Sequence, residues 1–278
     1  MKELKHLSEI FSNYDTFVID LWGVMHNGIK LNPKAIEAIN HLKNNAKKIV
    51  FLSNAPRPSA KVIDFLLKMK MDKQYLSNVM TSGEAAMNAI NNNKFGKKFF
   101  HLGPPRDVAI FEKVKENSTT IDNCEFILCT GLFDEDDPDI NKSQLHENDL
   151  DYYKNFLIKH ISKKLLCTNP DLTVHKGKKE EYCAGYIAKI FEELGGKVIY
   201  YGKPYKEIYE MCFQPNEKVL AIGDNVRTDI KGANNLNKDC LFISDGVHRD
   251  EFNNKLELEK LINKYKVTVN YFQNELKW

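Results

Sequence analysis

The sequence predicts an α/β protein built around a doubly wound parallel sheet, and three observations lead to this prediction. Short apolar runs without polar alternation, such as Phe17-Val18-Ile19 and Ile49-Val50-Phe51-Leu52, are typical of strands buried on both faces of a parallel sheet. Amphipathic helical segments such as residues 33–42 separate these runs. Several runs end in a polar residue or a glycine. Strands alternating with helices predict one parallel sheet with right-handed crossovers.

The first three strands are expected within residues 1–83. The first ends at Asp20 and is followed by Asn32-Pro33, an N-cap residue with proline at the first helical position. The second ends in Ser53-Asn54, and a helix follows the turn at residues 56–59. The third is short and leads through Thr81-Ser82-Gly83 into a helix over residues 84–91.

A second α/β unit is expected in the middle of the chain, followed by a return to the first. The middle unit has strands at 99–102, 125–129 and 165–167, with helices over 148–162 and 180–194. The remaining residues predict strands at 198–200, 219–222, 240–243 and, weakly, 267–271, with helices over 204–213, 227–236 and 249–264. The middle unit therefore interrupts the first. We predict a Rossmann-like core of residues 1–83 and 202–278, with residues 84–201 inserted as a smaller α/β domain.

Composition restricts the class of protein. With 278 residues, 42% hydrophobic and 28% charged, the chain has the composition of a globular protein. A net charge of +2 provides no reason to expect nucleic acid as a partner. No apolar run reaches the roughly 20 residues of a membrane span, and the charged N-terminus lacks the apolar segment of a signal peptide. Six cysteines without CxxC pairing predict reduced core thiols in a cytoplasmic protein.

Two charged stretches are interpreted as structural. The basic run Lys176-Gly177-Lys178-Lys179 continues into Glu180-Glu181, so we expect the solvated start of a helix. The acidic loop around residues 131–149 lacks the alternation, central glycine and final glutamate of a helix-loop-helix calcium site. We therefore expect no metal there.

Polar side chains follow four of the predicted strands or loops. They are Asp20, Ser53-Asn54, Lys203, and Asp224 with Asp229. Because the carboxyl ends of parallel strands meet at one edge of a sheet, these residues can converge. Taken singly, Asp20 could start a turn, Lys203 could be a surface lysine and Asp229 a carboxylate on a helix face. Together they supply a carboxylate nucleophile, a hydroxyl and an ammonium for phosphate oxygens, and carboxylates for Mg²⁺, which is the chemistry of phosphoryl transfer.

In this order the residues resemble the haloacid dehalogenase superfamily of phosphohydrolases over the whole chain. Its four motifs are similar to Asp20-Leu21-Trp22-Gly23-Val24, Phe51-Leu52-Ser53-Asn54, Gly202-Lys203-Pro204 and Gly223-Asp224-Asn225-Val226-Arg227-Thr228-Asp229. The last two look like those of class IIA, the group of nucleotide, sugar-phosphate and nitrophenyl phosphatases. Members of that class carry an α/β cap inserted after the third core strand, where this chain has residues 84–201. Cys167-Thr168-Asn169-Pro170-Asp171 also resembles a stretch of their caps.

The resemblance implies a role for each residue. Asp20 would be the nucleophile and a Mg²⁺ ligand, and Trp22 would lend its backbone carbonyl to the metal. Ser53 and the backbone of Asn54 would hold the transferring phosphoryl group, and Lys203 would pair with nucleophile and phosphate. Asp224 would bind Mg²⁺, and Asp229 would hold a metal-bound water or support the loop. The expected substrate is a small phosphorylated metabolite, and a homodimer through the cap is a further expectation of the resemblance.

One residue departs from the family pattern. Family phosphatases place a second aspartate two residues after the nucleophile, where this chain has Trp22. That aspartate protonates the leaving oxygen and activates water, which is typically worth about 10²–10⁴-fold. An indole N–H only donates a hydrogen bond. The substrate could therefore have a good leaving group, or His26 could substitute, although a surface turn residue is the commoner role of such a histidine.

The third alternative is a protein that binds a phosphorylated ligand with little turnover, or that hydrolyses something other than a phosphomonoester. Because Asp20, Lys203 and Asp224 are intact, we favour hydrolysis. Substrate specificity is expected from Arg57 and Ser59 after the second motif, which could equally be plain turn and helix-start residues. It is also expected from Asn169 and Asp171 of the inserted domain, although Asp171 could be only a turn residue after Pro170.

Overall fold

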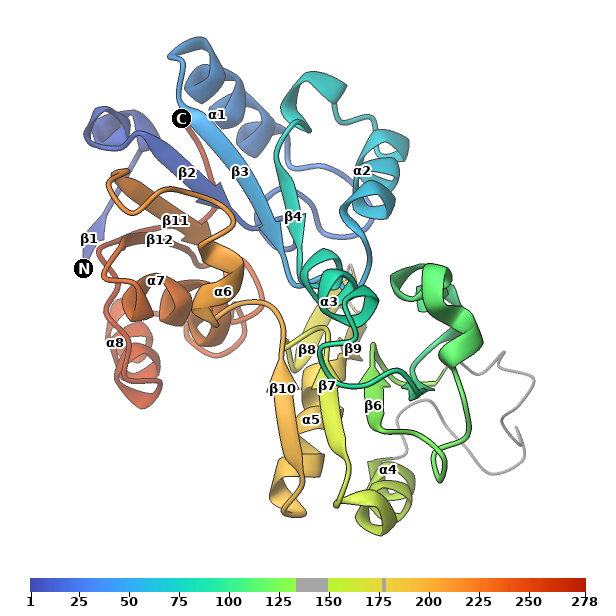
Figure 1. The fold of residues 1–278 in the computed structure, drawn as a ribbon. Coiled ribbons are helices and arrows are strands. Elements are labelled where there is room, and N and C mark those ends of the chain that lie inside the picture. The colour runs from blue at the N-terminus through green and yellow to red at the C-terminus, as the bar shows by residue number, and fades with distance from the viewer. Residues whose placement is uncertain (134–149, 177–178) are drawn as a thin grey trace.

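The computed structural model describes residues 1–133, 150–176 and 179–278. It contains two parallel sheets that lie side by side, with a two-stranded hairpin between them (Figure 1). The predicted α/β fold with a doubly wound sheet is confirmed. The acidic stretch Asp134–Asp139, where we expected no metal, lies outside the described residues.

The larger sheet has seven strands, all paired in parallel. Their order across the sheet is β1 (Lys2–Glu3), β13 (Tyr271–Gln273), β12 (Asp239–Ile243), β11 (Val219–Gly223), β2 (Thr16–Ile19), β3 (Lys48–Ser53) and β4 (Val79–Thr81). The central strands β2 and β11 are buried along their whole length. This burial explains why their sequences show no polar alternation.

Helices cover both faces of this sheet. One face packs against α1 (Pro33–Asn44) and α2 (Ser59–Lys68) through Ala38, Ile39 and Leu66. The other face packs against α6 (Lys206–Tyr209), α7 (Lys231–Asn235) and α8 (Lys255–Lys264). Asn32 caps α1 as predicted, because its side chain accepts a hydrogen bond from the Lys34 N–H.

The second sheet has four parallel strands, in the order β10 (Lys197–Tyr200), β7 (Lys164–Cys167), β6 (Phe126–Cys129) and β5 (Phe99–Leu102). Its faces are covered by α4 (Leu150–Leu157) with α5 (Ala184–Glu193), and by α3 (Ser82–Asn91). All six cysteines are free and buried.

The strands of the larger sheet come from residues 2–81 and 219–273, and those of the second sheet from residues 99–200. This distribution supports the division that we propose, a core of residues 1–83 and 202–278 and an inserted domain of residues 84–201. No helix within the described residues is long and apolar enough to cross a membrane.

Of the basic run, residues 177–178 lie outside the described residues, and Lys176 and Lys179 belong to strands rather than to the predicted start of a helix. Strand β8 (Thr173–Lys176) pairs antiparallel with β9 (Lys179–Tyr182), so the backbone there is committed to a hairpin. Helix α5 consequently begins only at Ala184, after Cys183.

Several predicted helices are shorter in the structure. Helix α8 begins after Asn254, whose side chain accepts a hydrogen bond from the Glu257 N–H and fixes the start six residues later than expected. The segment expected over 204–213 is helical only in α6, and the one expected over 227–236 starts with a π-helical turn at Val226–Ile230. The last strand lies at Tyr271–Gln273, beyond most of the predicted range. Such differences of a few residues are usual for boundaries inferred from apolar periodicity.

Candidate active site

Two carboxylates occupy the ends of the central strands. Strands β2 and β11 pair in register, with Ile19 opposite Ile222. The next residue of β2, Asp20, donates its backbone N–H to the Ile222 carbonyl at 2.8 Å. Asp224 directly follows β11, so both carboxylates leave the sheet at the same edge. The predicted convergence of Asp20 and Asp224 therefore follows from strand register.

Lys203 lies between carboxylates. Its Nζ donates to Asp20 Oδ1 at 2.6 Å and to Asp229 Oδ1 at 2.7 Å, and its side chain is 3% exposed. Charge-assisted hydrogen bonds of this length are among the strong ones in proteins. The predicted pairing of Lys203 with Asp20 is present, and Asp229 is a second partner that the sequence did not assign to this lysine.

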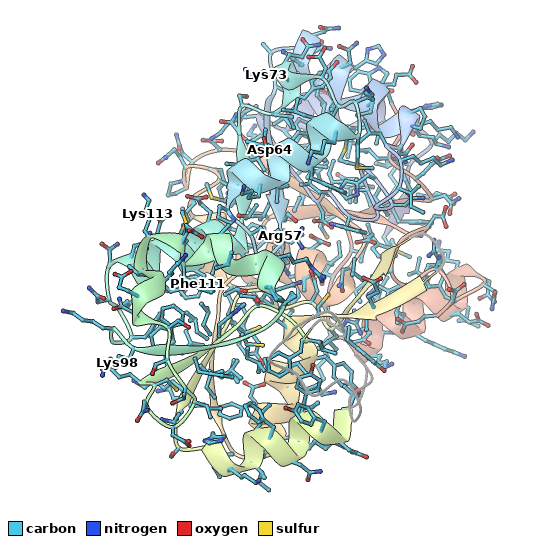
Figure 2. All side chains as sticks on the ribbon, turned by 90° about the vertical axis from the view of Figure 1, so that its right-hand side faces the viewer. Arg57, Asp64, Lys73, Lys98, Phe111 and Lys113 are labelled. Carbon is cyan, nitrogen blue, oxygen red and sulfur yellow. The ribbon has the colours of Figure 1, made fainter. Side chains whose placement is uncertain are left out.

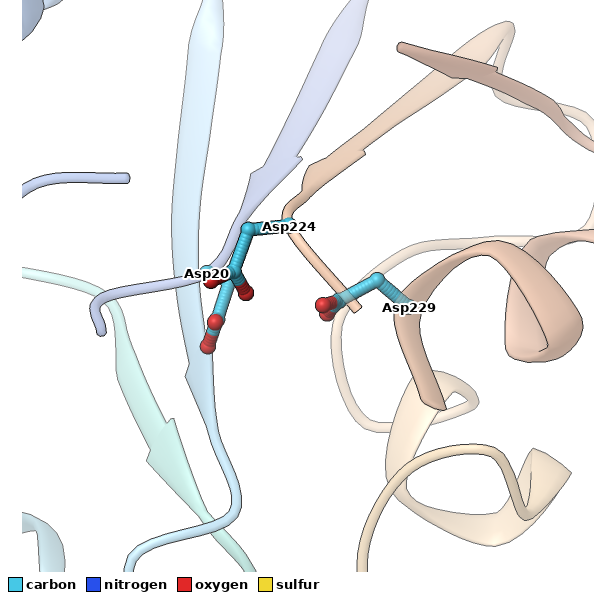
Figure 3. Close-up of side chains that lie close together, drawn as sticks. All are labelled: Asp20, Asp224 and Asp229. Atoms are coloured by element: carbon cyan, nitrogen blue, oxygen red, sulfur yellow. The ribbon is translucent and has the colours of Figure 1, made fainter. Parts of the chain in front are cut away.

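The three aspartates form one buried cluster. Asp20, Asp224 and Asp229 each offer a carboxylate oxygen, and these oxygens lie within 4.8 Å of one another. Figure 3 shows the side chains of Asp20 and Asp224 together at the strand ends, with Asp229 facing them from a helical turn. Asp224 Oδ2 accepts from the Val247 N–H at 2.8 Å, and Asp229 Oδ2 accepts from the Asn225 N–H at 3.1 Å.

Burial and mutual repulsion set the protonation of this cluster. Burial raises the pKa of Asp20 to about 7, although Lys203 opposes the shift. The pKa of Asp224 is raised well above its usual value by burial and by the charge of Asp20. Burial lowers the pKa of Lys203, but Asp20 and Asp229 outweigh it, and the net shift is upward. Lys203 is therefore a permanent cation beside carboxylates that repel one another.

The cluster fits a hard divalent cation. It brings three buried carboxyl groups to one point beside the single ammonium of Lys203, so all three can be ionised together only if a further cation offsets their repulsion. Carboxylate oxygens are ligands that Mg²⁺ prefers in proteins. Two glycines also leave space for the Asp224 carboxylate. A Cβ on Gly23 would lie 1.9 Å from Asp224 Oδ2, and one on Gly246 would lie 2.2 Å from the same oxygen.

Ser53 and Asn54 lie where the prediction expected them, at the end of β3 beside β2. Both are buried, and Ser53 Oγ accepts from the Ala55 N–H at 3.2 Å. The side chain of Asn54 has a function that the sequence did not suggest. Its Oδ1 accepts from the Lys203 N–H at 2.7 Å, and its Nδ2 donates to the Lys203 carbonyl at 3.2 Å. Asn54 thus clamps the backbone that carries Lys203.

A cavity of about 390 Å³ opens beside the cluster, lined by Asp20, Asp224 and Trp22 among other residues. His26 also lines it, but it is not a surface turn residue, because its side chain is buried. Its ring lies 4.9 Å from the Trp22 ring in an edge-on arrangement. Burial lowers the pKa of His26 to about 4, so the imidazole is neutral at pH 7. A neutral imidazole is a weak proton donor, which argues against His26 as the substitute acid.

The four predicted specificity residues occupy different surroundings. Asp171 lines the cavity and accepts from Asn225 Nδ2 at 3.4 Å. Asn169 is buried beneath it, with Oδ1 accepting from the Asp171 N–H. Arg57 and Ser59 are not among the described residues that line the cavity. Arg57 instead donates from Nε to Asp107 Oδ1 at 2.7 Å, and it lies at the junction of the two sheet units in Figure 2.

The structure also reveals supporting residues that the sequence did not indicate. His248 is fully buried, and its Nε2 accepts from the Val226 N–H at 3.2 Å while Nδ1 faces Glu251 Oε1 at 2.6 Å. This arrangement holds the loop between Asp224 and Asp229. Gly246 and Val247 follow strand β12, which neighbours β11. This loop could have been predicted from the sequence, because polar or glycine-containing segments that follow neighbouring parallel strands meet at one edge of the sheet.

Two family models match the chain. The haloacid dehalogenase-like hydrolase model matches residues 17–115, and the HAD-hydrolase-like model matches residues 200–266. Together they cover more than half of the chain and include Asp20, Lys203 and the three-aspartate cluster. The chain belongs to the haloacid dehalogenase-like hydrolases.

Individual proteins resemble this hydrolase along most of its length. The 5'-nucleotidase YutF of Bacillus subtilis is 23% identical over 246 residues, covering 86% of this chain and 90% of that protein. A haloacid dehalogenase-like hydrolase from Brucella suis superposes with a TM-score of 0.82 at 26% identity, covering 99% and 100%. The p-nitrophenyl phosphatase from Archaeoglobus fulgidus superposes at 0.69 with 18% identity, covering 94% and 96%. The hydrolase therefore shares its fold with the two superposed structures over nearly the whole chain.

Proposed function

We propose that this hydrolase is a Mg²⁺-dependent phosphatase of a small phosphorylated metabolite, acting through a phosphorylated Asp20. The observation that carries the proposal is the pair of contacts from Lys203 Nζ to Asp20 and Asp229 beside the cavity. The names of the relatives, a 5'-nucleotidase and a p-nitrophenyl phosphatase, agree with this reaction class.

The residues divide the work as follows. Asp20 attacks phosphorus with a carboxylate oxygen, and Lys203 balances the charge that collects around the phosphoryl group. Ser53 and the backbone of Asn54 hold the phosphoryl oxygens. Asp20, Asp224 and the Trp22 carbonyl would bind Mg²⁺, with Asp229 acting through a water. When bound, the cation would neutralise the charges of phosphate and carboxylates.

Three less direct expectations accompany this proposal. The inserted domain of residues 84–201 acts as a cap that contributes Asp171 to the cavity. The protein works in the cytoplasm, which its six free cysteines support. It forms a homodimer through the cap, which size-exclusion chromatography with light scattering tests directly.

Beryllium fluoride tests the nucleophile. With Mg²⁺ it forms a phosphoryl-like adduct on a nucleophilic aspartate, and fluorine NMR detects that adduct. We expect the adduct in the native protein and its loss in Asp20→Asn. Asp64→Asn is the matched control, because Asp64 is exposed on α2 (Figure 2) and is not a member of the cluster. A panel of metabolite phosphates with Mg²⁺, run beside Asp20→Asn, then identifies the substrate.

The alternative function is binding of a phosphorylated ligand with little turnover, which the missing aspartate at Trp22 favours. Binding of phosphate esters without adduct formation would support it and contradict the proposal. If the protein hydrolyses another class of substrate, the adduct should form but none of the metabolite phosphates in the panel should be hydrolysed.

A further inference from the structure

We infer that Trp22 selects the leaving group, so that the substrates are phosphate esters of phenols or enols. These leaving groups are planar and depart as anions that conjugation stabilises. This inference rests on the proposed phosphatase function and names its substrate class. It depends on three features of the structure: the placement of the indole, the hydrogen bonds of titratable groups in the same cavity, and the aliphatic residues that also line this cavity.

The indole of Trp22 is a fixed wall of the cavity. Trp22 follows Asp20 by two residues, is half-buried and lines the same cavity. Its ring meets His26 edge-on at 4.9 Å and 68°, and His26 meets Phe65 edge-on at 5.5 Å and 72°. Edge-to-face contacts of this kind favour one ring orientation. The row of three rings therefore holds the indole beside the nucleophile.

Three titratable groups that line the cavity with the indole make hydrogen bonds to other residues. The His26 ring is buried behind the indole, and its Nδ1 accepts from the Gly28 N–H at 3.1 Å. Asp224 Oδ2 accepts from Val247, and Asp171 faces Asn225. The Trp22 indole N–H makes no hydrogen bond to another described residue, so it is available to a ligand. It can donate a hydrogen bond to a departing oxygen, but the proton stays on the indole.

The same cavity has aliphatic lining that can accommodate a flat group. Thr173 and Val174 of strand β8 line the same cavity as Trp22, together with Val24 and Leu31. A planar leaving group placed among them would contact the indole and aliphatic side chains. Aromatic surfaces prefer such planar partners. Strand β8 thus contributes residues of the inserted domain to the cavity that contains Asp20 and Trp22.

The reaction balances without an acid when the leaving group is a stable anion. Asp20 forms a bond to phosphorus, and the bond to the ester oxygen breaks with its electron pair going to that oxygen as phenolate or enolate. Water then attacks phosphorus, and the pair of the broken bond returns to the Asp20 carboxylate. Both protons of that water leave on dihydrogen phosphate.

Three substrates separate leaving-group stability from planarity. Phenyl phosphate releases a phenol of pKa about 10, as in tyrosine. Benzyl phosphate keeps the planar ring but releases an alcohol, which is a far weaker acid than a phenol and therefore a poorer leaving group. Cyclohexyl phosphate releases an alcohol and is not planar. We expect the native enzyme to favour phenyl over benzyl phosphate in kcat/KM by about 10²–10⁴-fold, the usual value of an acid group.

The Trp22 variants test the two roles separately. Trp22→Asp supplies an acid and should reduce the preference for phenyl over benzyl phosphate by about 10²–10⁴-fold. Trp22→Leu should raise KM for phenyl and benzyl phosphate by about tenfold, the loss expected for an aromatic contact, and leave their kcat ratio unchanged. Trp22→Phe keeps a planar wall and should stay within about threefold of the native KM. Ratios measured on one preparation do not depend on its folded fraction.

Each result bears on the inference. Native turnover of benzyl phosphate within about tenfold of phenyl phosphate, or an unchanged KM in Trp22→Leu, would overturn it. So would selective loss of benzyl phosphate turnover in Asp171→Asn, which would make Asp171 the acid. If the beryllium fluoride adduct forms while these ratios fail, only the leaving-group inference is wrong. If no adduct forms and no ester is hydrolysed, the proposed phosphatase function itself is wrong.

Discussion

The Nζ atom of Lys203 lies 2.6 Å from Oδ1 of Asp20, although 183 residues separate the two in the sequence. The same ammonium contacts Asp229, so its removal leaves two buried carboxylates without their cation.

We expect Lys203→Met to lower kcat by about 10²–10³-fold, the usual cost of losing one group that stabilises developing charge. Without Mg²⁺ the free energy of unfolding should fall by about 3–5 kcal/mol, because a buried charge pair has been broken. Steady-state kinetics and urea unfolding in EDTA measure the two effects. Lys206→Met, an exposed lysine of α6 whose ion-pair distance is 3.7 Å, is the control. Equal activity of the two variants would exclude Lys203 from the reaction.

The stability of the metal-free protein should depend on pH through Asp20. Its pKa is about 7 in the folded state and near 3.8 in the unfolded chain, so the folded state binds more protons between these values. The contribution of Asp20 to the free energy of unfolding therefore falls as pH rises from about 4 to about 7, at up to 1.4 kcal/mol per pH unit for one group. Lys203 stays protonated throughout this range and contributes no slope.

Urea unfolding of the native protein and Asp20→Asn in EDTA, from pH 4 to 8, isolates this contribution. The free energy of unfolding should fall more steeply with pH in the native protein than in the variant. Mg²⁺ should raise the melting temperature more at pH 8 than at pH 5. Parallel slopes would mean that Asp20 is not the titrating group.

Gly23 is required for two separable reasons. Its φ of +76° disfavours any other residue, and a Cβ would lie 1.9 Å from Asp224 Oδ2. Gly23→Ala should therefore lose about 1–2 kcal/mol of stability from backbone strain and also at least about tenfold in kcat/KM and Mg²⁺ affinity. Gly195 has a φ of +92°, and nothing lies within 4 Å of its Cβ position. Gly195→Ala should thus show the strain alone, and a similar loss of activity there would refute the role of close packing.

Arg57 should stabilise the junction of the two units and leave substrate affinity unchanged. Asp107 is nearly fully buried, whereas the Arg57 side chain is 39% exposed, so solvent weakens the pair. We expect Arg57→Met to cost about 1–2 kcal/mol of stability, with a positive coupling to Asp107→Asn in a double-mutant cycle. KM should change by less than about threefold. A rise in KM of tenfold or more would restore Arg57 as a substrate contact.

The strand ends could be predicted from the sequence because burial leaves a local signal. Asp20, Ser53 and Asp224 each follow an apolar run, and parallel strands carry such residues to one edge of the sheet. The hairpin of β8 and β9 could not be predicted in this way. Its short, highly charged strands carry no apolar run, and the same residues are equally compatible with the polar first turn of a helix.

By itself, the sequence determined the α/β fold, the order of the strands along the chain and the set of polar residues at their ends. Only the tertiary structure decided which groups contact one another: Lys203 bridges two aspartates, Asn54 holds the backbone of Lys203, and Arg57 pairs with Asp107 away from the cavity. It also showed that His26 is buried and packs edge-on against Trp22, whereas the sequence favoured a surface turn residue. Periodicity reports which side of an element is buried, but pairing across 50 to 200 residues depends on how the elements pack.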